Sequence, residues 1–236
     1  MQILMSHMRA AMEKYNMVED GDVIAVGVSG GKDSLALMYA LSEMRRFYPK
    51  KYEVKAITAD MCFFGEKTDF SEITALCGKL GIEHIIRETE LYHIIFETRK
   101  EKNPCSLCAR MRRGILHDMT KEAGCNKLAL GHHMDDAAET FMMNLLSGGR
   151  IESFRPVTYL SRKDLTMIRP MIFAAEKEVE KAANKTALPT VASPCPMDKT
   201  SNRNEMKELL KELNYKYPAV KEKIIGGLQN AELNGW

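Results

Sequence analysis

Hydrophobic positions along the first 150 residues follow two alternating patterns. Apolar runs of four to six residues, typical of buried strands, alternate with longer segments in which apolar residues recur at helical spacing. The pattern predicts strands at 23–28, 54–59, 82–86 and 127–130, and helices at 3–16, 33–49, 69–80, 104–124 and 134–146. Strands that alternate with helices predict a mainly parallel sheet covered on both faces, which is a doubly wound α/β fold.

The pattern changes near residue 185. Three prolines, Pro189, Pro194 and Pro196, interrupt a polar segment, and two short amphipathic helices are predicted after it, at 202–213 and 219–232. We therefore predict one α/β domain with an N-terminal helix over residues 1–185. A C-terminal appendage over residues 186–236 would consist of a loop and two short helices.

Composition excludes several classes of protein. With 236 residues, of which 45% are hydrophobic and 28% charged, the chain resembles soluble globular domains and is large enough to bury a core without disulfides. We see neither an apolar stretch that would span a bilayer nor a secretory signal, so we expect a cytoplasmic protein without membrane contact. The net charge of +2 gives no general argument for nucleic-acid binding, which would depend on local basic clusters such as those around Arg45 and Arg112.

A glycine-rich segment, Ser29-Gly-Gly-Lys-Asp-Ser34, follows the first predicted strand and precedes a helix. Backbone amides and the positive end of a helix can bind phosphate at such a position. Gly30 and Gly31 allow close backbone approach, and Lys32 supplies a positive charge. Asp33 can cap the helix. The spacing matches neither GxxxxGK[ST] nor GxGxxG, but the segment still predicts a phosphate site.

A second polar segment, Gly131-His-His-Met-Asp-Asp-Ala-Ala-Glu-Thr140, follows the predicted strand at 127–130. Ligands of parallel sheets bind at such strand ends. Gly131 would let a ligand approach, and His132 can donate a hydrogen bond to a phosphoryl oxygen. Mg²⁺ prefers carboxylate oxygens, which Asp135, Asp136 or Glu139 could supply. The same acids would also suit the first turn of a helix, where they complement its dipole.

Together, SGGKDS and GHHxDDxxET resemble the pyrophosphatase-loop (PP-loop) ATPases, which split ATP into AMP and pyrophosphate. The resemblance implies a PP-loop fold of the adenine nucleotide α-hydrolase type, with ATP and Mg²⁺ as cofactors. It implies catalytic roles for Lys32, Asp33, His132 and Asp136, magnesium ligation by Asp135 and Asp136, and nucleotide contacts from Ser29, Gly30, Gly31, Lys32, Asp33, Ser34, Asp60 and Gly131. Asp60 is the weakest of these assignments, because an acid at a strand end often forms a turn.

Three of the six cysteines form a further pattern. Cys105 and Cys108 lie one turn apart at the predicted start of a helix, whose positive end favours thiolates. A zinc site would need a second pair of ligands, which the sequence lacks, and Cys195 between two prolines is the plausible third partner. Three thiolates without a fourth predict a [4Fe-4S] cluster with one open iron. A persulfide relay through Cys105 or Cys195 without a cluster is the alternative.

The order of glycine loop, CxxC, GHHxDD and a late Cys-Pro resembles the tRNA-cytidine 2-sulfurtransferase family over nearly the whole chain. The resemblance implies that ATP adenylates the C2 oxygen of a cytidine in tRNA, and that sulfur from a cluster on Cys105, Cys108 and Cys195 replaces it. Adenylation converts a poor leaving group into AMP. We expect tRNA as substrate, a cysteine desulfurase or inorganic sulfide as sulfur donor, and a homodimer as one possible assembly. A sulfurtransferase for another substrate and a nucleotide-binding redox sensor are the alternatives.

Overall fold

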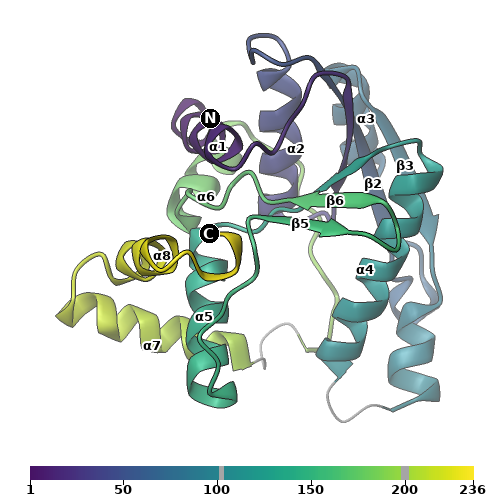
Figure 1. Ribbon diagram of the computed structural model, residues 1–236. Helices are drawn as coiled ribbons and strands as arrows, with labels where there is room; N and C mark the ends of the chain where they lie inside the picture. The colour runs from purple at the N-terminus through teal and green to yellow at the C-terminus, as the bar shows by residue number, and fades with distance from the viewer. Residues whose placement is uncertain (101–103, 198–201) are drawn as a thin grey trace.

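The computed structural model describes residues 1–100, 104–197 and 202–236 (Figure 1). Its centre is a six-stranded sheet in the order β3-β2-β1-β4-β6-β5. Every neighbouring pair is parallel except β5 and β6. The strands are β1 (Asp22–Gly27), β2 (Tyr52–Asp60), β3 (Glu83–Glu88), β4 (Lys127–Ala129), β5 (Val157–Leu160) and β6 (Leu165–Ile168).

Helices cover both faces of this sheet, as the sequence predicts. On one face, α1, α2, α3 and α6 pack into the larger core, and on the other face α4 packs through Met119 onto Ala25 and Leu128. No described helix is long and apolar enough to cross a membrane. The helices are α1 (Gln2–Lys14), α2 (Lys32–Met44), α3 (Ser71–Leu80), α4 (Pro104–Glu122), α5 (Met134–Gly148), α6 (Glu176–Lys185), α7 (Asn202–Lys216) and α8 (Val220–Asn230).

The structure confirms the doubly wound fold and adds elements that the pattern did not predict. The β5–β6 hairpin is absent from the prediction because a threonine, Thr158 or Thr166, interrupts the apolar run in each of its short strands. Helix α6 and a π-helical turn at His93–Thr98 were also not predicted. The helix predicted over 33–49 ends at Met44.

The sheet topology brings the two polar segments together. Strand β1 lies between β2 and β4, so the connections after β1 and after β4 leave on opposite sides of a switch point. Ligands of open α/β sheets bind in the crevice outside such a point. The glycine loop follows β1 and Gly131 follows β4, so both segments line this crevice.

The C-terminal helices lie beside α5, away from the sheet (Figure 1). Leu210 of α7 is fully buried, and Ile225 and Leu228 of α8 belong to the larger core. These contacts pack the segment predicted as an appendage against α5 and the larger core. The position of α7 and α8 beside α5 determines which site residues these helices can contact.

Candidate functional site

The glycine loop is closed by its own side chains. Ser34 Oγ accepts a hydrogen bond from the Ser29 amide at 3.1 Å and donates one to the Gly31 carbonyl at 2.9 Å. Gly30 has φ +85°, which glycine adopts without strain. Helix α2 begins after Gly31 without a side-chain cap, so the prediction that Asp33 caps it is wrong. The first amides of α2 therefore have no side-chain acceptor from a cap and can bind an anion.

Gly131 is required by the protein backbone. A Cβ at this position would lie 3.1 Å from the Asp33 carbonyl carbon and from the Ser34 nitrogen. The sequence suggested that a ligand approaches Gly131, whereas the structure places the first turn of α2 against it. This contact fixes the distance between the two predicted motifs.

The two motifs enclose a cavity of about 260 Å³, which we call the loop cavity. Lys32 is not part of its lining, although the sequence places it in the same motif. The polar residues that line this cavity are Ser29, Asp33, Ser34, Arg112, Gly131, His132 and Asp136. Four of these seven residues, Ser29, Asp33, Ser34 and Gly131, were predicted to contact the nucleotide. His132 and Asp136 were predicted as catalytic residues, and Arg112 had neither prediction.

His132 is held by a buried arginine. Arg169, which is 5% exposed, donates from Nε to His132 Nδ1 at 3.3 Å. Its guanidinium also lies 4.9 Å from the centre of the Phe154 ring. Burial, with the charge of Arg113 adding to it, lowers the Arg169 pKa to about 10. Because Nδ1 accepts this hydrogen bond, Nε2 is the ring nitrogen of His132 that carries a hydrogen.

The neighbouring histidine, His133, organises the start of α5. Its amide donates to Asp136 Oδ2 at 2.8 Å, and its Nδ1 accepts from the Asp136 amide at 3.4 Å. These bonds form a capping box. Asp136 therefore serves the helix start while it also lines the loop cavity. Sequence reasoning did not single out His133 from the pair, although a buried histidine before a helix is a capping signal.

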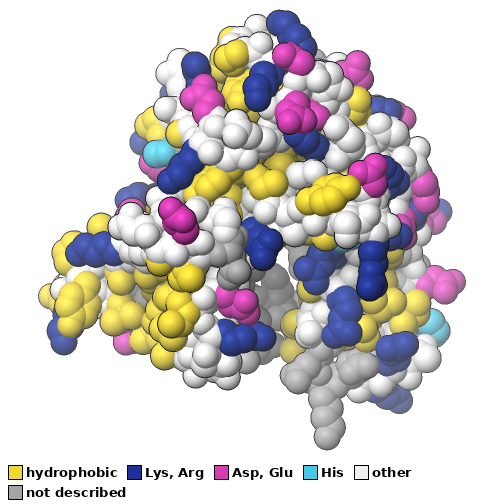
Figure 2. Space-filling model, in the orientation of Figure 1, with side chains coloured by type: hydrophobic (Ala, Val, Ile, Leu, Met, Phe, Trp, Pro, Cys, Tyr) yellow, Lys and Arg dark blue, Asp and Glu magenta, His cyan; other side chains and the backbone are white. Residues whose placement is uncertain are grey.

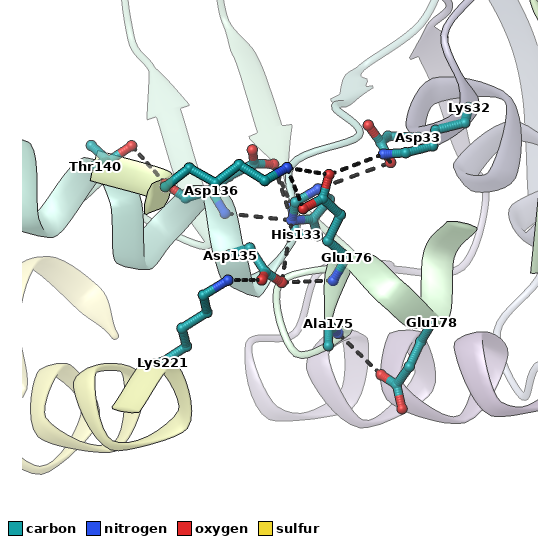
Figure 3. Close-up of polar contacts among 11 residues, drawn as sticks. Lys32, Asp33, His133, Asp135, Asp136, Thr140, Ala175, Glu176, Glu178 and Lys221 are labelled. Carbon is teal, nitrogen blue, oxygen red and sulfur yellow. Dashed lines mark hydrogen bonds and ion pairs between the residues drawn. The ribbon is translucent and has the colours of Figure 1, made fainter. Parts of the chain in front are cut away.

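The Asp135 side chain points away from the loop cavity and towards α6 and α8. Its Oδ2 accepts the Glu176 amide at 2.6 Å, and its Oδ1 pairs with Lys221 of α8 (Figure 3). Asp135 is 5% exposed and does not line the loop cavity. Of the two predicted magnesium ligands, only Asp136 borders the loop cavity.

Lys32 extends from the glycine loop towards α6 (Figure 3). Its Nζ donates to Asp33 Oδ1 at 2.9 Å and to Glu176 Oε1 at 3.4 Å. Burial opposes the charged form, but these two carboxylates outweigh it and raise the Lys32 pKa. Lys32 borders a second cavity of about 570 Å³, the lysine cavity, which is also lined by Asp135, Glu176, Lys207 and Lys221.

A third cavity, of about 460 Å³, contains two of the predicted cluster cysteines. Cys108 of α4 and Cys195 both line it, and we call it the cysteine cavity. Cys105 is exposed in the first turn of α4. The chain that leads to Cys195 is attached to the glycine loop, because the Val191 amide donates to the Gly30 carbonyl at 3.0 Å.

The charge around Cys108 fits a thiol cluster. Burial raises the Cys108 pKa, and the nearby Cys195 and Cys105 thiols raise it further, whereas Arg112 lowers it. Arg112 follows Cys108 by four residues, so both side chains lie on one face of α4. Cys108 and Cys195 thus line the same cavity, and the role of the three cysteines as ligands stays a prediction.

The described residues contain no group of three or more His, Cys, Asp or Glu side chains arranged to hold a single metal ion. The cysteine ligands of an iron–sulfur cluster bind different iron atoms, so they need not converge on one point. Two thiols that line one cavity, Cys108 and Cys195, with Cys105 one turn before Cys108, therefore fit a cluster better than they fit zinc.

Asp60 acts mainly within its own loop. Its carboxylate accepts from the Thr68 amide and hydroxyl, both at 2.8 Å, and from the Cys62 amide at 3.1 Å. This is the turn-forming role that the sequence offered as the alternative, although Asp60 also lines the cysteine cavity.

Cys77, by contrast, lies in the core and away from the three cavities. Burial raises the Cys77 pKa to about 11, which agrees with an inert core thiol.

The loop cavity and the cysteine cavity share a wall. Ser29, Ala59 and Arg112 line both of them. A nucleotide in one cavity and thiols in the other would therefore lie on two sides of the same three residues. The sequence analysis offered Arg112 only as part of a basic cluster for nucleic acid, although its spacing from Cys108 was a signal for a position beside the cysteines.

Residues 4–213 match the PP-loop domain family. The chain therefore belongs to the PP-loop family. Within it, the chain is 39% identical to a tRNA-cytidine(32) 2-sulfurtransferase from Geobacter metallireducens, over 94% of this chain and 87% of the relative. The enzyme of the same name from Geobacter sulfurreducens is 38% identical over the same shares.

Solved structures show the same relationship. The U34-tRNA thiolase NcsA from Methanococcus maripaludis, with its [4Fe-4S] cluster, is 27% identical and superposes with a TM-score of 0.77 over 97% of this chain and 78% of that chain. The NH3-dependent NAD synthetase from Campylobacter jejuni shares the fold. It is 16% identical and superposes with a TM-score of 0.51 over 100% of this chain and 96% of that chain.

Proposed function

We propose that this protein is an ATP-dependent tRNA sulfurtransferase, which replaces the C2 oxygen of a cytidine in tRNA with sulfur. The observation that carries the proposal is the wall shared by the loop cavity and the cysteine cavity. Thiolation needs an activated carbon next to a sulfur source, and the two cavities that would hold them have Ser29, Ala59 and Arg112 in common. The names of the relatives support cytidine in tRNA as the substrate.

The loop cavity supplies the groups for adenylation. The amides at the start of α2 and the Ser29 and Ser34 hydroxyls bind phosphoryl oxygens, and His132 donates from Nε2 to the oxygen that gains charge. The cytidine O2 attacks the α-phosphorus of ATP, the bond from that phosphorus to the bridging oxygen breaks, and pyrophosphate leaves. Asp136 would hold Mg²⁺ beside the phosphates, because it is the predicted magnesium ligand that lines this cavity.

The cysteine cavity supplies the sulfur side. Cys105, Cys108 and Cys195 would hold a [4Fe-4S] cluster, which when bound supplies an iron that is open to a sulfur ligand. Arg112 lies in the shared wall, where its guanidinium can orient the AMP phosphate of the adenylated base. A sulfide nucleophile forms the C2–S bond, the C2–O bond breaks, and AMP leaves with the former C2 oxygen. Inorganic sulfide would provide this sulfur directly, whereas a cysteine desulfurase would provide it as a persulfide that a thiol reduces to sulfide.

A basic surface beside the cavities fits tRNA. On the face shown in Figure 2, Lys and Arg side chains gather over α4, the helix that also carries Cys108. This helix carries Arg110, Arg112, Arg113 and Lys121. Such side chains bind phosphates of RNA without reading its sequence. A cytoplasmic location would bring the enzyme together with tRNA, and a homodimer stays a prediction.

The test uses anaerobically purified protein, a tRNA transcript with an unmodified cytidine, ATP and sulfide. We expect iron and acid-labile sulfide in the protein, 2-thiocytidine in digested tRNA, and one AMP released for each thiolated base. Cys62→Ser is the matched control for Cys108→Ala, because Cys62 lies at the same edge of the sheet but does not line the cysteine cavity.

Two results would contradict the proposal. Thiolation at the full rate by iron-free protein would replace the cluster with a persulfide relay. AMP formation with no thiolated nucleoside in any tRNA would point to a different acceptor.

A further inference from the structure

The lysine cavity joins the C-terminal helices to the glycine loop. Lys207 of α7 donates to Glu176 Oε1 at 2.9 Å, and Lys32 donates to the same oxygen at 3.4 Å. The two ammonium groups are thus neighbours on one carboxylate. Lys207 comes from the segment predicted as an appendage, and nothing in the motifs points to it.

A second ion pair fixes this arrangement. Lys221 of α8 pairs with Asp135, whose other oxygen accepts the Glu176 amide at 2.6 Å (Figure 3). Asp135 is buried and cannot move away without losing both partners. The carboxylate of Glu176 is therefore held in front of Lys32, and α7 and α8 are both attached beside the start of α2.

The two ammonium groups of this cluster are paired with carboxylates. Lys32 and Lys207 face Asp33 and Glu176, which gives two positive and two negative groups. Pyrophosphate brings several further negative charges, and it competes with Glu176 for the same ammonium groups. An ammonium group released from Glu176 lies next to Lys32, where it can bind the same phosphates.

We propose that Lys207 is a second ammonium donor to the β- and γ-phosphates of ATP and to the pyrophosphate that leaves, with Glu176 as the carboxylate that both lysines exchange for phosphate. This inference rests on the proposed function, because it requires ATP to be split between the α- and β-phosphates. It assigns the C-terminal helices a role at the leaving-group end, away from the thiols.

The experiment measures binding of pyrophosphate and of AMP, each with Mg²⁺, to the full chain by calorimetry. Lys207→Met should weaken pyrophosphate binding about tenfold, as expected for loss of one charged hydrogen bond. AMP lacks the β- and γ-phosphates, so its affinity should stay within about twofold. Glu176→Gln removes the competing charge and should tighten pyrophosphate binding.

Two control variants separate the loss of the Lys207 contact from a general loss of folding. Lys216→Met removes an exposed lysine from the far end of the same helix and should leave both affinities unchanged. Lys207→Arg should restore most of the pyrophosphate affinity. Equal weakening of AMP and pyrophosphate in Lys207→Met, or no change in either, would overturn the inference. If the unaltered protein bound neither ATP nor pyrophosphate, the proposed function itself would fail.

Discussion

The two ends of the crevice are built differently. The glycine-loop end is packed backbone against backbone, with Gly131 in contact with the first turn of α2. At the cysteine end, Cys105 is exposed, and the segment before Cys195 is tied to the loop by the Val191–Gly30 hydrogen bond. A phosphate site needs fixed amides, whereas a thiol site that accepts sulfur and a tRNA base needs access. The difference predicts that the two half-reactions can be damaged separately.

The largest effect should come from removing one residue at each end. Cys108→Ala removes a predicted cluster ligand, so thiolation should fall by more than about a hundredfold while ATP binding stays within about twofold. Lys32→Ala should weaken ATP binding and leave the iron content unchanged. Nucleoside analysis measures thiolation, calorimetry measures ATP binding, and iron determination measures the iron content. If Lys32→Ala also lost its iron, the two ends would be one cooperative unit.

Gly131→Ala tests how tightly the phosphate end is packed. The new methyl group would lie 3.1 to 3.2 Å from three backbone atoms of α2, which cannot move as a side chain would. We expect a loss of about 2–3 kcal/mol in the free energy of unfolding. Gly78→Ala in α3 is the matched control, because nothing lies within 4 Å of its new methyl group. Urea unfolding of both variants provides the comparison, and equal stability would refute the packing argument.

Gly30→Ala tests the connection between the two ends. Gly30 and Gly21 have nearly equal angles, φ +85° and +84°, but only Gly30 has a neighbour, Val191, 3.1 Å from the position of a Cβ. Alanine should cost about 1 kcal/mol of backbone strain at either position. The contact with Val191 should add to this at Gly30 and displace the segment that carries Cys195. Iron content should therefore fall in Gly30→Ala and stay unchanged in Gly21→Ala.

Much of this site could be predicted because its parts are local. SGGKDS and GHHxDD each follow a strand, and the parallel topology alone brings them to one edge. The position of Arg112 in the shared wall and the role of the buried Arg169 were not predicted, because both depend on which distant elements pack against these residues. The same holds for Lys207, a lysine in a helix with many charged residues, whose partner Glu176 lies 31 positions away. Contacts across such distances in sequence leave no periodic signal.

The smallest expected effect is on the stability of the folded protein at acidic pH. Burial opposes the charged form of Glu176, but Lys207 and Lys32 outweigh it and lower the Glu176 pKa below its usual value of 4.5. A carboxyl with a lowered pKa stabilises the folded protein above its unfolded pKa, and this contribution is lost as the pH falls through the folded pKa. Between about pH 5 and pH 3, the unaltered protein should therefore lose more stability than Glu176→Gln does. Thermal unfolding across this range measures the difference, and parallel pH profiles would show that the Lys207 contact adds no stability. Because the contact joins only the phosphate end to α7, iron content should be the same in both proteins at neutral pH.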